Sequence, residues 1–316
     1  MTFIASVIAK NGVAIIADSL VTTKTLSLDY SNWVNFLKNK GDETGSLDSI
    51  KIDPHEIIRL FSSNPHHTKD YEEKLFKFDE YTCITTAGWA EINNKRIGEI
   101  VFEISKNNGS YSDINDAIQA LKNHLKEYVK AHIEENKQIG VTNLLITHFD
   151  NHGSGNTTIK KLVINESNDQ THEENYFRIE EFHPLEKVVC DGQNRISERI
   201  LFGEAHIIDR VITILMNKIT TDFNFDKEKL NEYRMSLFKE KEIEERIHAG
   251  LNIFKLSDLS LQQAVDLAAL LMRLEMDFQT YTEDIPTVGG VIKLAVIDKE
   301  GFRFIAGDEI TRPTNI

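Results

Sequence analysis

Residues 2–19 read TFIASVIAKNGVAIIADS, and this stretch decides the fold. Residues 3–8 form an apolar run that predicts a β-strand, and residues 13–17 form a second run that ends at Asp18. Between them, Lys10-Asn11-Gly12 predicts a tight turn, because Asn-Gly readily takes the positive φ values of two-residue hairpins. We therefore expect the chain to begin with a β-hairpin.

A second informative stretch, KLFKFDEYTCITTAG, covers residues 74–88. It predicts strands at 75–78 and 81–86, which Asp79-Glu80 joins by a turn. Ala87-Gly88 then opens an expected helix over residues 90–105. Lys74 and Lys77 differ by an odd number of positions, so they lie on the same strand face only if a bulge intervenes.

The remaining elements come in separate blocks of strands and helices. A helix is expected at 113–135, with Ser112 as its N-cap and one buried apolar face. Such blocks favour antiparallel sheets covered by helices over a βαβ repeat, so the fold class is α+β. Further strands are expected at 143–149, 159–164, 176–182, 187–190, 291–297 and 302–305, and further helices at 194–216, 227–251 and 260–281.

Residues 24–70 differ in character from their surroundings. They combine Gly, Asn, Asp and Pro with short apolar pieces, which indicates an inserted segment that is part helix and part loop. The 316 residues therefore read as one domain, 1–316, with an insertion of unassigned role at 24–70.

Composition limits the partners. Hydrophobic residues make up 41% and charged residues 27%, which is typical of a soluble globular protein, and the net charge is −14. An acidic chain is a poor match for nucleic acid or an anionic membrane, and no apolar run approaches the ~20 residues of a membrane span. Without a basic leader, and with Cys83 and Cys190 read as buried reduced thiols, we expect a cytoplasmic protein.

Conventional catalytic motifs are absent from the sequence. Gly-x-Ser-x-Gly does not occur, and Ser154 lies in a polar Gly-Ser-Gly loop that is more typical of a hairpin. No Walker loop or Gly-x-Gly-x-x-Gly is present, and Gly289-Gly290 precedes a strand rather than a helix. His66-His67 lacks a third ligand, so we expect neither a cofactor nor a metal.

Thr2 offers a different chemistry. Methionine is usually removed before a small residue, and removal leaves a threonine with both a hydroxyl nucleophile and a free α-amine. An α-amine has an unperturbed pKa of about 7.7–8.0, so it can take the hydroxyl proton without a histidine. With Met1 attached the amine is an amide, and we expect that form to be inactive.

The two stretches together resemble proteasome β subunits and their bacterial relatives HslV and Anbu. In that family a nucleophilic threonine starts a strand, a Gly marks the hairpin, an Ala-Asp pair ends the return strand and a lysine strand leads to an Ala-Gly turn. The spacings Thr2 to Gly12, Thr2 to Asp18 and Lys74 to Gly88 all match. The resemblance covers about 40 residues closely, and it implies a four-layer αββα sandwich of the N-terminal-nucleophile hydrolases, with the insertion after the first hairpin.

The resemblance also implies roles for individual residues. Lys74 would lower the pKa of the Thr2 hydroxyl and amine, and Asp18 would hold that lysine charged. The Gly88 amide would donate to the oxyanion. Thr22 would align an extended peptide by strand addition, and Ser19 would support the site.

Two positions depart from the family pattern. Asp191 in Cys190-Asp191-Gly192-Gln193 stands where proteasome subunits have a serine that supports the amine. Near the end, Val288 replaces the serine before the glycine pair, so Thr287 or Asp284 is expected to substitute. The region 260–294 is closer to Anbu than to true proteasome subunits.

The resemblance implies a threonine peptidase that cleaves peptide or unfolded-protein substrates within a homo-oligomer. The helices at 194–216 and 260–281 are the candidate assembly surfaces. The resemblance assigns neither a ring size nor an ATPase partner. Two alternatives stay open: a non-proteolytic amidase on a small amide, and a catalytically silent structural subunit.

Overall fold

The protein has a mixed α and β fold with antiparallel sheets. It is described from a computed structural model. The described residues are 2–44, 53–69, 71–107, 109–136, 139–153, 155–165, 176–182, 186–202, 205–223, 226–237, 256–282 and 286–305.

The first sheet contains the N-terminal hairpin and has the strand order β12-β1-β2-β13-β14. Every pair is antiparallel, and the register places Ile4 opposite Ala17 and Ala9 opposite Gly12. The expected hairpin is therefore confirmed. The strands are β1 (Phe3–Ala9), β2 (Gly12–Ala17), β12 (Val188–Gly192), β13 (Lys293–Asp298) and β14 (Gly301–Phe304).

The reason for Gly12 differs from the expected one. Neither Asn11 nor Gly12 has a positive φ. A Cβ on Gly12 would instead lie 2.6 Å from the carbonyl oxygen of Ile297 on the neighbouring strand β13. Glycine is needed here because two backbones approach closely, and not because the turn is left-handed.

The second sheet has the order β11-β10-β9-β6-β5, again antiparallel throughout. Its strands confirm the blocks expected around residues 75–86 and 143–182. They are β5 (Leu75–Lys77), β6 (Thr82–Gly88), β9 (Thr142–Phe149), β10 (Thr157–Ile164) and β11 (Phe177–Glu181).

The two sheets face each other across a buried apolar layer. Alternation along β1 sends Ile4 toward the second sheet, whereas Phe3, Ala5 and Val7 point the other way. A hydrogen bond of 2.9 Å between the hydroxyls of Ser6 and Thr147 crosses the layer. The residues between the sheets include Ile4, Val13, Ile15, Leu75, Cys83, Leu145 and Ala295.

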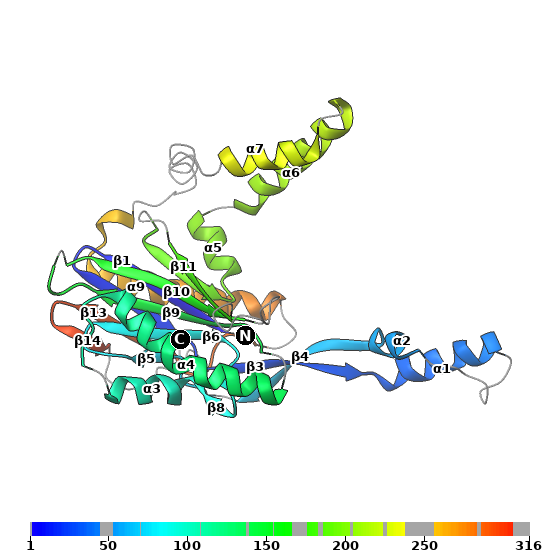
Figure 1. The fold of residues 1–316 in the computed structure, drawn as a ribbon, viewed down its shortest axis with the longest axis horizontal. Coiled ribbons are helices and arrows are strands. Elements are labelled where there is room, and N and C mark those ends of the chain that lie inside the picture. The colour runs from blue at the N-terminus through cyan, green and yellow to red at the C-terminus, as the bar shows by residue number, and fades with distance from the viewer. Residues whose placement is uncertain are drawn as a thin grey trace.

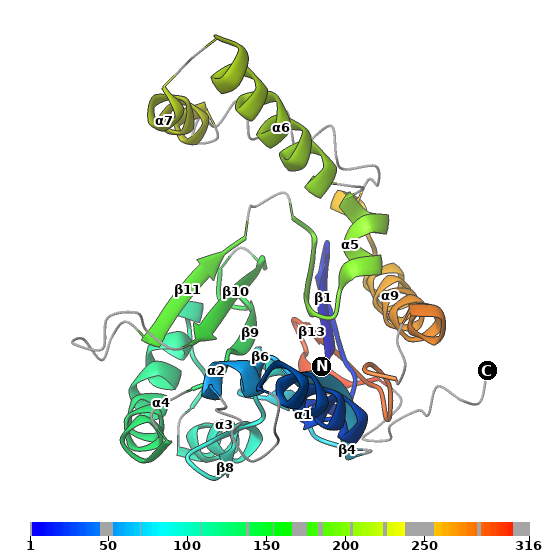
Figure 2. The ribbon, with the colours of Figure 1, turned by 90° about the vertical axis from the view of Figure 1, so that its right-hand side faces the viewer.

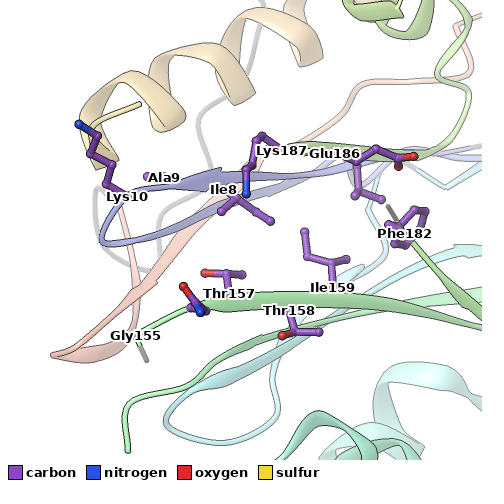
Figure 3. A pocket seen from close by; sticks show the side chains of 12 residues that line it. Ile8, Ala9, Lys10, Gly155, Thr157, Thr158, Ile159, Phe182, Glu186 and Lys187 are labelled. Atoms are coloured by element: carbon purple, nitrogen blue, oxygen red, sulfur yellow. The ribbon is translucent and has the colours of Figure 1, made fainter. Parts of the chain in front are cut away.

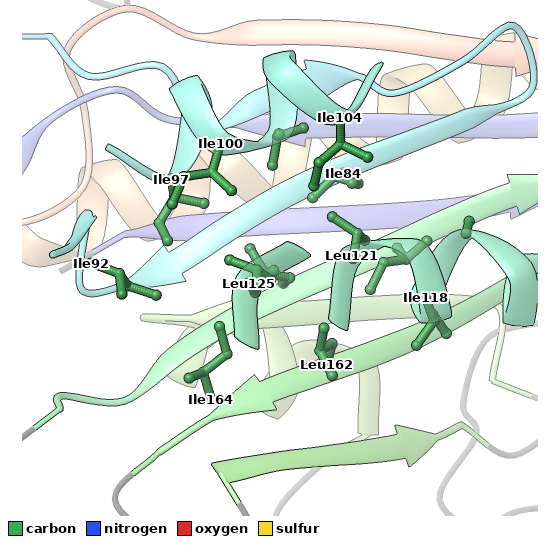
Figure 4. Close-up of a cluster of buried hydrophobic side chains, with 14 of the residues drawn as sticks. Ile84, Ile92, Ile97, Ile100, Ile104, Ile118, Leu121, Leu125, Leu162 and Ile164 are labelled. Atoms are coloured by element: carbon green, nitrogen blue, oxygen red, sulfur yellow. The ribbon is translucent and has the colours of Figure 1, made fainter. Parts of the chain in front are cut away.

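Helices cover the outer face of each sheet (Figure 2). α3 (Ile97–Asn107) and α4 (Ile114–Asn136) pack on the second sheet, and Figure 4 shows their isoleucines and leucines meeting those of β6 and β10. α5 (Arg195–Phe202) and α9 (Leu261–Thr282) cover the first sheet through Leu201, Ala268 and Leu271. Because β1 and β2 are covered on both faces, their sequence is apolar almost without alternation.

Two helical boundaries differ from expectation. Residues 91–96 form a small hairpin, β7 (Glu91–Ile92) and β8 (Lys95–Arg96), in which Asn93 and Asn94 both have positive φ, so α3 begins at Ile97 and not at residue 90. The cap of α4 is Asp113, whose carboxylate accepts from the Asn115 amide at 2.6 Å, and not Ser112.

The expected helix at 194–216 is two helices, α5 and α6 (Ala205–Phe223). α7 (Lys227–Leu237) begins where expected, and a 3-10 turn, η3 (Leu256–Asp258), precedes α9. Residues 238–255, which include the second half of the helix expected at 227–251, lie outside the described residues. In Figures 1 and 2, α6 and α7 project away from the two sheets.

Residues 24–70, expected to be part helix and part loop, contain two helices as expected and also a two-stranded β-ribbon that was not expected, while residues 45–52 and 70 lie outside the described residues. β3 (Val21–Leu28) and β4 (Phe61–Lys69) pair along their whole length, and α1 (Tyr30–Thr44) and α2 (Pro54–Ile58) lie between them in sequence. Figure 1 shows this arm extending away from the sheets, with α1 and α2 at its far end. The two strands satisfy each other's backbone hydrogen bonds. The sequence of residues 24–70 has no clear alternation of apolar and polar residues, so the strands were not predicted.

Shortening the arm tests its independence from the two sheets. Residues 28–61 are removed and Ser27 is joined to Ser62, its cross-strand partner, through Asn-Gly. We expect the melting temperature to fall by less than about 4 °C, since about 1 kcal/mol corresponds to 2–4 °C at this size. Calorimetry measures it, with Leu121→Ala, a buried truncation that should cost about 2–5 kcal/mol, as positive control. Loss of cooperative unfolding on shortening would contradict the arm's independence.

Candidate active site

Asp18 is the buried centre of the candidate site. It directly follows β2, and its side chain is 0% exposed. Oδ1 accepts hydrogen bonds from the Phe3 amide at 3.0 Å and from Lys74 Nζ at 2.9 Å, and Oδ2 accepts from the Gly289 amide at 3.1 Å. The carboxylate thus joins the start of β1, the approach to β5 and the segment before β13.

Lys74 directly precedes β5 and is also buried, with its side chain 6% exposed. Its ammonium donates to Asp18 and, at 2.6 Å, to the carbonyl oxygen of Leu20. Lys77, at the other end of β5, is exposed. The structure therefore separates the two lysines of this strand, as their odd spacing predicts.

The two charges shift each other's pKa. Burial lowers the pKa of the Lys74 ammonium and raises the pKa of the Asp18 carboxyl, and their ion pair opposes both shifts. Both oxygens of Asp18 already accept hydrogen bonds, so a proton on either one would displace a donor. The hydrogen bonds therefore favour the ionised pair.

Thr2 precedes β1 and is 5% exposed. Its carbonyl oxygen accepts from the Gln193 amide at 2.6 Å. Gly192 stands beside it with φ +87°, and a Cβ there would lie 2.0 Å from the same oxygen. The tight approach of β12 thus fixes the backbone of Thr2.

Thr2 and Lys74 line one cavity of about 750 Å³. Gly88 and Thr22 line it as well. Four of the residues expected to act together, contributed by separate segments of the chain, therefore meet at one surface. The other lining residues include Leu20, Glu72, Glu73, Thr86, Trp89, Ile97 and His132.

Gly88 ends β6 and has φ +100°. A Cβ there would lie 2.2 Å from the carbonyl oxygen of Val141, which accepts from the Trp89 amide at 3.1 Å. The position requires glycine for both reasons. The predicted strand-to-helix junction is wrong in detail, because the β7–β8 hairpin separates Gly88 from α3.

Ser19 and Thr22 fasten the segment that follows Asp18. The Ser19 hydroxyl accepts from the Val291 amide at 2.6 Å, and the amides of Ser19 and Leu20 both donate to the Gly289 carbonyl at 3.0 Å. The Thr22 hydroxyl donates to the Pro286 carbonyl at 3.2 Å. These bonds tie residues 19–22 to the chain just before β13.

Thr287 is fully buried and joins a network that the sequence did not reveal. Its amide donates to Gln279 Oε1 at 2.6 Å, and its hydroxyl donates to the side chain of Gln193. The Val288 amide also donates to Gln279, at 2.9 Å. Since the Gln193 amide binds Thr2, the network reaches from α9 to the nucleophile candidate.

Gln279 is one of two polar side chains on the buried face of α9. Glu275 is the other, and its carboxylate accepts from the Ser197 amide at 2.6 Å. The sequence could have revealed both residues, because they continue the three-and-four spacing of Ala264, Ala268 and Leu271 on the apolar face of the helix. Polar residues on such a face need buried partners.

Asp191 lies opposite Ile4 in the register of β12 with β1, on the strand face that Thr2 shares, but among the described residues its carboxylate makes no hydrogen bond to Thr2. The carboxylate accepts from the Gly192 amide at 2.7 Å, and its other oxygen lies 3.8 Å from Lys161 Nζ on the second sheet. Val288, at the position of the family serine, is buried in the apolar core under α9. Asp284, Ser154 and Met1 lie outside the described residues.

The histidines and cysteines considered in the sequence do not form a metal site or a reactive thiol among the described residues. Within the described ranges, no group of three His, Cys, Asp or Glu side chains could hold a metal. Burial raises the pKa of the Cys83 and Cys190 thiols, which disfavours the reactive thiolate. His66 and His67 lie in β4, with His66 opposite Thr23.

Comparison of the chain with family models and with curated proteins found no match. In the part of the chain that the structure describes, every helix is too short or too polar to span a membrane.

Replacing Lys74 by methionine should destabilise the protein by about 3–5 kcal/mol, because the Asp18 carboxylate stays buried without its cation. Chemical denaturation measures the change. Lys77→Met on the same strand is the matched control, with an expected change within about 0.5 kcal/mol. Equal stability of the two variants would show that the Lys74–Asp18 pair does not form in solution.

Proposed function

We propose that this chain is an N-terminal threonine hydrolase of the proteasome β-subunit type that cleaves peptide bonds. One observation carries the proposal. Thr2, Lys74 and Gly88 line a single cavity, and the buried Asp18 carboxylate holds the lysine. These are the positions to which the resemblance assigns nucleophile, cation, oxyanion donor and lysine partner.

The arrangement supports the fold part of the same proposal. Two antiparallel sheets face each other, α3 and α4 cover one, and α5 and α9 cover the other. We infer from this order of layers a four-layer αββα sandwich of the N-terminal-nucleophile hydrolases. The arm of β3 and β4 is then an insertion at the rim of the cavity, since Thr22 and Glu72 both line it.

The reaction begins once Met1 is removed. The free α-amine of Thr2 takes the hydroxyl proton, and Oγ1 attacks the carbonyl carbon of the substrate amide. Lys74 stabilises the negative charge that develops on the hydroxyl oxygen, and the Gly88 amide donates to the oxyanion of the tetrahedral intermediate.

The intermediate then breaks down. The C–N bond breaks, the leaving amine takes the proton from the Thr2 ammonium, and an ester to Oγ1 remains. Water, deprotonated by the same amine, hydrolyses the ester and restores the hydroxyl. No cofactor is required for this sequence of proton transfers.

Cavity size and position favour a peptide over a small amide. About 750 Å³ accommodates a side chain together with several backbone units. Thr22 is the second residue of the arm strand β3 and lines the cavity together with Lys74, so an extended substrate would add to the backbone there as a further strand.

A catalytically silent subunit is the second candidate. It is favoured by the buried apolar Val288 and by the contacts of Asp191 with Gly192 and Lys161 and not with Thr2. In that case the cavity would persist as a structural remnant without a working amine.

Intact mass separates the candidates. The purified protein is weighed before and after an epoxyketone or β-lactone probe, with Thr2→Ala as control, since alanine also permits methionine removal. We expect loss of Met1 and one adduct that is absent from the variant. A fluorogenic peptide assay then distinguishes a peptidase from an amidase that is labelled but leaves peptides uncut. A mature chain that takes no adduct would establish the silent subunit instead.

We also propose that the chain forms a homo-oligomer through α6. Its residues Val211, Ile214, Leu215, Ile219 and Phe223 are 47%, 57%, 53%, 37% and 71% exposed and follow three-and-four spacing along one face of a projecting helix. An exposed apolar stripe of this kind is typical of an interface.

Replacing Ile214 and Leu215 by serine should dissociate the oligomer, because it removes apolar surface from the centre of the stripe. Light scattering after size exclusion measures the mass. Phe102→Ser on α3, where the side chain is 56% exposed, is the control and should leave the mass unchanged. A wild-type protein that is monomeric at micromolar concentration would refute the assembly.

A further inference from the structure

The two ends of β1 are held in different ways. At the end remote from Thr2, a cavity of about 500 Å³ lies between the two sheets. Figure 3 shows Ile8 and Lys187, on the side of the first sheet, facing Thr157 and Ile159 of β10 across this space. Close packing between the sheets therefore does not extend along the whole of β1. The position of Thr2 depends on contacts at its own end of the strand, and one side chain of α9 organises them.

That side chain is Gln279, which is 5% exposed and lies near the end of α9. Its Oε1 accepts hydrogen bonds from the amides of Thr287 at 2.6 Å and Val288 at 2.9 Å, and its Nε2 donates to the Val288 carbonyl. The acceptor and the donor of the glutamine amide are thus both used on two successive residues. A buried and fully paired amide of this kind favours one backbone geometry. Gln279 thereby fixes residues 287–289, which we call the strap.

The strap is connected to both parts of the candidate catalytic machinery. At one end, the Gly289 amide donates to Asp18 Oδ2 at 3.1 Å, so the strap supplies one of the donors that the buried carboxylate requires. At the other end, the Thr287 hydroxyl donates to the side chain of Gln193, whose own amide donates to the Thr2 carbonyl at 2.6 Å. Displacement of the strap would therefore disturb both the partner of the lysine and the backbone of the nucleophile candidate.

Glu275, one turn earlier on the same face of α9, provides a contrast. It is 2% exposed, and its carboxylate accepts from the Ser197 amide of α5 at 2.6 Å. This bond joins α9 to α5, and neither residue lines the Thr2 cavity. The helix thus carries two buried polar side chains, of which one is connected to the candidate site and the other joins two helices.

Gln279, we propose, is a positioning residue for the reaction at Thr2, a role that rests on the hydrolase function proposed above. It is not among the described residues that line the cavity, so it acts through the strap and not by contact with the substrate. Loss of its hydrogen bonds should therefore slow the attack by Thr2 and leave the affinity of the cavity for a substrate or probe nearly unchanged.

Gln279→Met tests the proposal, because methionine has a similar length and makes none of the three hydrogen bonds. The rate of β-lactone adduct formation is followed by intact mass over a range of probe concentrations, which separates the maximal rate from the concentration that gives half of it. We expect the maximal rate to fall at least tenfold and the half-saturating concentration to change less than twofold. Glu275→Met removes a similarly buried polar group from the same face and should leave both values within twofold of the wild type.

Substitutions of Thr287 test the strap without altering the helix. Thr287→Val removes the hydroxyl that reaches Gln193 and should lower the maximal rate severalfold, whereas Thr287→Ser keeps the hydroxyl and should retain most of the rate. This pair carries the test if Gln279→Met does not fold, which its circular dichroism spectrum and melting temperature would reveal.

Three outcomes would overturn the proposal and leave the hydrolase function standing. They are a wild-type labelling rate in a folded Gln279→Met, equal slowing in Glu275→Met, and equal rates in Thr287→Val and Thr287→Ser. A wild-type chain that loses Met1 and takes no adduct would instead refute the hydrolase function and the role of Gln279 together.

Discussion

The ion pair between Asp18 and Lys74 is the interaction on which the rest of the site depends. Both groups are buried, and a carboxylate in that position is stable only with donors on both oxygens. The donors come from Phe3, Lys74 and Gly289, three segments that are remote in sequence. The pair therefore acts as a geometric constraint: the N-terminal strand, the lysine and the glycine segment before β13 must occupy fixed relative positions for the charge to be tolerated.

The fold itself was largely predictable from apolar patterning, because most strands are continuous runs between clear turn residues. The hairpin of residues 2–19 is one example. Its glycine shows the limit of the method, since Gly12 is required by the approach of Ile297 from a strand almost 300 residues later. Strands β3 and β4 were missed for a related reason. Their pairing depends on each other and not on a core, so neither carries the apolar alternation that marks a half-buried strand.

The parts of the candidate site that could be predicted are those for which spacing along the sequence determines where the side chain lies. Lys74 lies next to Asp18 as the matched spacing implied, and the odd interval to Lys77 correctly separated the two lysines. The positions of the supporting residues could not be predicted from the sequence in this way. The approach of Asp191 to Lys161 depends on how the second sheet packs against β12, and the role of Gln279 depends on how α9 packs over residues 287–288. Tertiary packing decides both, and local pattern does not encode it.

The arm has a consequence for how the chain can vary. It leaves the body after Ser19 and returns at Glu72, and the Glu72 amide donates to the Ser19 carbonyl at 2.8 Å. The two ends of the arm are therefore as close together as the ends of a tight turn, so the two sheets need only a short connection at this point. The entropy of closing so long a loop is offset by the pairing of β3 with β4 rather than by the core. Arms of very different length could accordingly be exchanged at this point without moving Lys74, so that the periphery diversifies while the buried charge stays in place.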